Sequence, residues 1–80
     1  MAILVDYEIG GSIEKDAYIR VEHISGSKNS GWHGHVYVLN SSRDMIIDTF
    51  EIDAPYESDV RGYASLYTVI QDMHPSGIAV

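Results

Sequence analysis

The sequence predicts one α+β domain, in which a small antiparallel sheet or half-open barrel of about four strands carries one C-terminal helix packed on it. Segments rich in β-branched and aromatic residues recur through residues 2–53, and short polar stretches separate them. Apolar residues at helical spacing then cover residues 58–73. Because the chain has 80 residues, with no internal repeat or low-complexity segment, we expect residues 1–80 to form a single domain.

The first strand is predicted over residues 2–9, AILVDYEI, which are mostly β-branched, aliphatic or aromatic. The pair Gly10 and Gly11 follows and is typical of a turn. Residues 12–17, SIEKDA, are polar and acidic, so we predict a connecting loop or a single turn there.

The second strand is predicted over residues 18–25, YIRVEHIS, because apolar and polar residues alternate. This alternation places Ile19, Val21 and His23 together on the face that turns inward. Residues 26–31, GSKNSG, have loop composition and predict a flexible hairpin tip.

The third strand is predicted over residues 32–40, WHGHVYVLN. Both of its faces carry apolar groups, so it lies either centrally under a helix or against a second chain. One face holds Trp32, Val36 and Val38, and the other holds His33, His35, Tyr37 and Leu39.

The fourth strand is predicted over residues 45–53, after a turn at residues 40–42. Asp48 interrupts its inward face, and Pro55 ends it because proline cannot donate to the ladder. We expect Ile46, Phe50 and Ile52 on one side and Thr49 and Glu51 on the other.

The helix is predicted over residues 58–73, with Ser58 or Asp59 as its N-cap. Pro75 and Gly77 end it. The apolar tail, residues 78–80, is left without a partner in this scheme, so we expect it to pair with a neighbouring chain. The predicted apolar stripe comprises Val60, Tyr63, Ala64, Tyr67 and Ile70, and Leu66 and Met73 widen it.

Composition excludes several classes of function. Hydrophobic residues make up 45% of the chain, which argues against disorder, and a net charge of −7 disfavours nucleic acid and anionic lipid surfaces. No apolar stretch approaches the roughly 20 residues that span a bilayer. We therefore expect no nucleic-acid or membrane partner and synthesis in a cytoplasm. With no cysteine and a small core, we expect the chain to be stabilised by association with other chains.

His33 and His35 form the sharpest candidate for chemistry, since side chains at i and i+2 of a strand share a face and can share a divalent ion. One alternative is therefore a small metal-binding module that uses these two residues. Two ligands do not complete a site, and His23, His74 or Asp48 would have to supply the rest. The plainer interpretation is two histidines on a half-exposed strand, and we predict no metal and no cofactor.

No catalytic constellation is visible, so we expect the protein not to be an enzyme. Four acids surround Pro55, but we interpret them as solvated residues that favour a helix N-terminus rather than as an acid–base pair. No nucleophile elbow and no phosphate-binding glycine motif is present. The four acids are Glu51, Asp53, Glu57 and Asp59.

Several segments together resemble a group of small structural proteins encoded among the tail genes of bacteriophages and prophages. The segments that carry this resemblance are MAILVDYEIG at 1–10, DAYIRV at 16–21, GHVYVL at 34–39, SSRD at 41–44, FEI at 50–52 and GYA at 62–64. The resemblance implies a virion component or accessory of the tail or baseplate, without catalytic residues.

From this resemblance we expect a virion protein that contacts tail, baseplate or fibre subunits in many copies, as an adaptor or as an accessory for fibre attachment. A capsid decoration (cement) protein is the alternative within the same particle. The predicted contacts come from tyrosines and apolar groups on strand edges and on the tail. The residues expected at the interface are Ile3, Val5, Tyr7, Trp32, Tyr37, Leu39, Ile78 and Val80.

Overall fold

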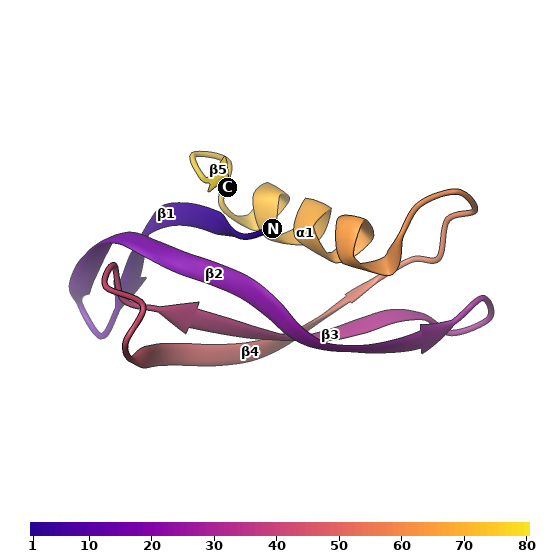
Figure 1. The fold of residues 1–80 in the computed structure, drawn as a ribbon, viewed down its shortest axis with the longest axis horizontal. Coiled ribbons are helices and arrows are strands. Elements are labelled where there is room, and N and C mark those ends of the chain that lie inside the picture. The colour runs from indigo at the N-terminus through magenta and orange to yellow at the C-terminus, as the bar shows by residue number, and fades with distance from the viewer.

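The computed structural model describes residues 1–80 as a five-stranded open antiparallel sheet with one helix packed on it near the C-terminus (Figure 1), which confirms the predicted α+β class. The strands lie in the order β4-β3-β2-β1-β5. The helix is too short and too polar to span a lipid bilayer. The elements are β1 (Ile3–Ile9), β2 (Ser12–Ser27), β3 (Gly31–Leu39), β4 (Ile46–Ala54), α1 (Gly62–Met73) and β5 (Ile78–Ala79).

The loop predicted over residues 12–17 is wrong, because β2 begins at Ser12 and this segment pairs with β1. Gly10 and Gly11 have φ values of 58° and 82°. Two successive residues in the left-handed region form a tight turn whose twist matches a hairpin, so the second strand resumes at once. The hairpin pairing overrides the polar composition from which the loop was predicted.

A β-bulge in β2 corrects the predicted faces of that strand. The pairing with β3 shifts register between Val21 and Ile24, which places the side chain of Ile24 against the core. His23 therefore lies on the opposite face, beside rings of β3, and does not share the inward face with Ile19 and Val21. An extra residue in one strand reverses the faces of all later residues, and alternation in the sequence does not reveal it.

A second bulge, at Ile47 in β4, explains why Ile46 is 50% exposed instead of facing inward with Phe50 and Ile52. The predicted inward position of Asp48 is confirmed by its hydrogen bond with Tyr7, a side chain that packs against the core.

The core lies between α1 and the inner face of the sheet. Ile3, Ile19, Val36, Val38, Leu66 and Ile70 are its largest fully buried side chains. The predicted alternation of β3 holds for Val36 and Val38, which both lie in this core.

The helix starts later than predicted, at Gly62, and neither Ser58 nor Asp59 caps it. Asp59 has a φ of 68° in the preceding turn, and the N-cap position is Arg61, which makes no side-chain capping bond. Residue 62 packs closely against β3, because a Cβ there would lie 2.7 Å from an indole carbon of Trp32. The first helical residue therefore has to be one without a side chain.

The apolar stripe of the helix is rotated from the predicted one. Leu66 and Ile70 are fully buried, whereas Tyr63 and Ala64 are exposed. A Cβ on Gly34 would meet Leu66 at 2.8 Å, so a residue without a side chain in β3 accommodates the leucine. The contact is a close helix-to-sheet approach that the spacing of apolar residues alone does not reveal.

Tyr67 holds the helix to the N-terminal part of the sheet. Its hydroxyl donates to the main-chain oxygen of Met1 at 2.7 Å and accepts from the main-chain N–H of Val21 at 2.9 Å. Burial raises the pKa of this phenol above its ordinary value, while the bond from Val21 opposes the rise.

The C-terminal tail pairs within its own chain, so the predicted pairing with a neighbouring chain is wrong. β5 lies antiparallel to β1, and Ala2 and Val80 exchange main-chain hydrogen bonds of 3.0 and 2.8 Å. Turns between Met73 and Ile78 bring the tail back, with Gly77 so close to Ile3 that a Cβ there would lie 2.6 Å from its side chain.

Candidate functional site

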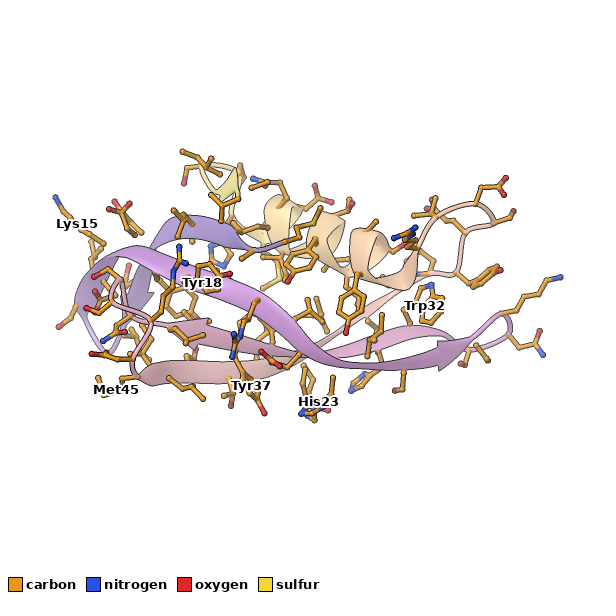
Figure 2. All side chains as sticks on the ribbon, viewed as in Figure 1. Lys15, Tyr18, His23, Trp32, Tyr37 and Met45 are labelled. Carbon is orange, nitrogen blue, oxygen red and sulfur yellow. The ribbon has the colours of Figure 1, made fainter.

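No helix covers the face of the sheet opposite α1, which we call the outer face. His23 and Tyr37 point away from the helix on this side of the ribbon (Figure 2). The outer face of β3 carries His33, His35 and Tyr37 in alternate positions, as the sequence predicts for a strand. The fold therefore leaves a collection of polar and aromatic side chains uncovered on this side.

A histidine–carboxylate cluster joins β3 to β4 on the outer face. His33 lies opposite Asp53 and His35 lies opposite Glu51 in the strand register. His33 Nδ1 is 2.7 Å from an oxygen of Asp53, and His33 Nε2 is 2.7 Å from an oxygen of Glu51. The same oxygen of Glu51 lies 3.1 Å from His35 Nε2. The carboxylates of Asp53 and Glu51 therefore lie on either side of the His33 imidazole, and the Glu51 carboxylate also contacts the imidazole of His35.

The contacts change the titration of two members of the cluster. Hydrogen bonding to Asp53, then to Glu51, raises the pKa of His33 above its ordinary value. The hydrogen bond with His33, then the charge of His35, lowers the pKa of Glu51. Both side chains are substantially exposed, at 43% and 56%, so water screens these ion pairs and each one stabilises the fold only weakly.

His23 joins this cluster from β2 because of the bulge described above. Its ring lies 6.0 Å from that of His35 and 6.4 Å from that of Tyr37, both in edge-on orientations. The rings of His33 and His35 are 6.2 Å apart. A group of aromatic rings therefore joins β2 to β3 on the outer face.

The cluster does not have the arrangement of a metal site. No group of three or more histidine, cysteine, aspartate or glutamate side chains is placed to hold an ion. Both ring nitrogens of His33 are occupied by carboxylates. Two of the additional ligands considered from the sequence lie elsewhere, since His74 packs on Tyr7 and Asp48 faces inward. These contacts give no support to the metal-binding alternative for His33 and His35.

The residues expected at an interface fall into three groups. Ile3, Val5 and Leu39 are buried in the folded chain, so they present almost no surface to a partner. Tyr7 and Trp32 are partly buried and pack against the core. Tyr37, Ile78 and Val80 remain accessible, the first on the outer face and the other two in the tail, at 66% and 54% exposure.

The sheet covers some strand edges and leaves others open. β3 lies between β2 and β4 and under α1, which is the first of the two positions that its apolar faces predict. β1 is partly covered, because β5 pairs with Ile3 and Leu4. β4 and β5 are the two edge strands, and β4, with nine residues against two, has the longer open edge.

Sequence reasoning missed the role of Glu51 and Asp53, which we had interpreted as acids near the helix N-terminus. They lie in β4 and pair with imidazoles, whereas Glu57 and Asp59 do lie in the exposed connection to the helix. The sequence does carry a signal for this pairing. His33 and His35 are two residues apart, and so are Glu51 and Asp53, so antiparallel pairing of their strands can place each histidine beside an acid.

Two hollows beside α1 differ in their lining. The first, of about 310 Å³, is lined by Met1, Val21, Tyr63 and Tyr67, without a carboxylate or an imidazole. The second, of about 250 Å³, includes the exposed carboxylates of Glu57 and Asp72. Comparison with models of protein families, with curated proteins and with solved structures finds no match to this chain.

Proposed function

We propose that this protein is a structural component of a bacteriophage particle, which acts through protein–protein contacts as a tail or baseplate adaptor or as a fibre-attachment accessory. The proposal combines the resemblance of its sequence segments to small tail-module proteins with the surface that the fold presents. It requires neither a cofactor nor catalysis.

One observation supports this function most directly: the sheet has a helix on one face only, and its outer face ends at β4, a strand that is paired on one side only. An unpaired edge exposes main-chain donors and acceptors that another chain can complete. A chain of 80 residues buries a small core, so contacts with larger subunits also add stability.

The test is the composition of purified particles. Mass spectrometry of density-purified virions, from a lysogen or phage that carries the gene, is expected to detect the chain at a stoichiometry of several copies. Reconstruction of the particle is expected to place it at the tail or baseplate. A fraction of the same lysate without assembled particles serves as the control, because it shows how much free chain is carried into the virion sample.

Absence of the chain from intact particles overturns this proposal. Density on the outside of the capsid overturns the tail or baseplate assignment and supports the decoration protein instead. Deletion of the gene provides a second readout, since loss of an adaptor is expected to yield particles without fibres or with incomplete tails.

A further inference from the structure

The free side of β4 has two unequal halves. The half near Ile46 contains the bulge at Ile47, and Asp48 there points inward. Bulges and inward-facing charges are features that protect strand edges from adding another chain. The half from Thr49 to Ala54 pairs with β3 in regular register and has neither feature. It is therefore the part of the edge suited to strand addition.

The main chain of this regular half shows which groups face outward. The N–H of Thr49 donates to Oδ1 of Asp48 at 2.9 Å. This N–H group therefore does not point to β3, and a side chain already satisfies it. Because main-chain groups in an antiparallel strand alternate in direction, the N–H and C=O groups of Glu51 and Asp53 also face the free side. No strand lies there to pair with them.

The negative charge of the segment Thr49–Ala54 favours a partner strand that carries positive charge. β4 carries three acids and no basic residue, and the chain as a whole has a net charge of −7. Glu51 and Asp53 project from the outer face at the same positions whose main chain faces the free side. A second copy would bring a further acidic strand to this edge, which like-charge repulsion disfavours.

We propose that the segment Thr49–Ala54 receives an extended strand of another protein that carries lysine or arginine at alternate positions. The main chain of that strand pairs with Glu51 and Asp53, and its cationic side chains lie on the outer face against the two carboxylates. This inference rests on the proposed function, because it identifies the chemistry of one contact that an adaptor makes.

The protonation of the neighbouring imidazoles affects how strongly this strand binds. His33 lies against both carboxylates, and His35 reaches Glu51, so protonated histidine competes with the incoming cations. His23 also lies on this face, with its ring 6.0 Å from that of His35, and Arg20 and Glu22 pair with each other on β2. Binding is expected to strengthen as the pH rises and His33 loses its proton.

The test uses the full chain and two synthetic peptides of identical composition, one alternating valine and lysine and one with the lysines grouped together. Amide hydrogen exchange followed by NMR is the main readout. The alternating peptide is expected to slow exchange at Glu51 and Asp53, while the amide of Thr49, already bonded to Asp48, changes least. The grouped peptide is expected to have little effect on any of the three.

Two charge variants separate strand addition from general attraction to an acidic protein. The double variant Glu51→Gln, Asp53→Asn is expected to weaken binding of the alternating peptide about three- to tenfold. The control Glu8→Gln, Asp72→Asn removes the same charge from two exposed acids in β1 and α1, outside β4. This control is expected to change binding of the alternating peptide by less than about twofold.

Equal weakening in both variants, equal effects of both peptides, or no slowed exchange in β4 overturns the inference. Any of these results leaves the chain's presence in particles untouched, because that is measured separately. Conversely, absence from particles together with slowed exchange at Glu51 and Asp53 removes the proposed function and keeps the strand-addition site.

Discussion

The hydroxyl of Tyr7 in β1 donates a 2.5 Å hydrogen bond to the carboxylate of Asp48 in β4, although β2 and β3 lie between their strands. The sheet therefore curves enough for a long side chain from one strand to reach across the inner face. Burial, then the hydrogen bond to Asp48, raises the pKa of the Tyr7 phenol to about 12. The bond satisfies an inward-facing acid that would otherwise lie against the core without a donor from a side chain.

Replacement of Tyr7 by phenylalanine is expected to lower the free energy of unfolding by about 1–3 kcal/mol, because one oxygen of a partly buried carboxylate loses its side-chain donor. Urea unfolding followed by circular dichroism measures the change. The variant Asp48→Asn keeps an acceptor for the phenol, so its free energy of unfolding is expected to fall less than that of Tyr7→Phe. An unchanged midpoint for Tyr7→Phe would show that water replaces the phenol at no cost.

Replacement of Gly62 by alanine is expected to destabilise the protein by about 1–3 kcal/mol, even though alanine favours helices by roughly 1 kcal/mol. The new Cβ would lie 2.7 Å from Trp32 and equally close to Ile24, so the helix start has to move. Trp32 fluorescence is expected to shift, and urea unfolding gives the loss.

The matched control for Gly62 is Ala64→Gly, two residues along the same helix at an exposed position. It is expected to cost about 1 kcal/mol through helix propensity alone, without a change in Trp32 fluorescence. If Gly62→Ala proved more stable than the parent, close packing against the indole would be the wrong explanation for the late helix start.

The pKa of His33 is expected to fall toward 6.5 in the variants Asp53→Asn and Glu51→Gln, with the larger change for Asp53, because its hydrogen bond is the larger cause of the raised value. NMR titration of the imidazole measures it. Glu14→Gln removes one charge from a distant part of the sheet and serves as the control. A His33 titration that is the same in all four proteins would contradict the geometry of the cluster.

The same cluster predicts how stability depends on pH. A raised pKa in the folded state means that His33 stabilises the fold fully below 6.5 and loses this contribution as the pH rises through the raised value. The lowered pKa of Glu51 means that its contribution is complete above 4.5 and is lost as the pH falls through the lowered value. The two contributions coincide between pH 4.5 and 6.5, and the difference in urea midpoint between parent and Glu51→Gln is expected to be largest there.

Deletion of residues 78–80 is expected to lower the free energy of unfolding by about 1–3 kcal/mol, since two main-chain hydrogen bonds with Ala2 are lost. It also frees the edge of β1, so sedimentation velocity is expected to show self-association. The control Ile78→Thr, Val80→Thr keeps the main chain and changes side chains that are already exposed. Equal behaviour of the control and the deletion would assign the effect to the side chains rather than to strand pairing.

The outer-face cluster could be predicted only in part. The sequence places His33 and His35 on one face of a strand, because alternation depends only on local geometry. It does not show that Glu51 and Asp53 lie beside them, since that depends on strand register, which brings His33 against residues 18 and 20 positions away in the chain. His23 reaches the cluster through a bulge that the composition of its strand does not mark.

The sequence by itself determined the α+β class, the approximate positions of four strands and the helix, the placement of Val36 and Val38 on one face of their strand, and the inward placement of Asp48. Periodicity is a local property, and burial of one face follows from it. The tertiary structure decided the bulges, the later start of α1, the pairing of the tail with β1 and the exposure of the β4 edge. These features depend on which segments pair and how closely Gly62 and Gly34 let the helix approach, and such contacts arise between residues far apart in the chain.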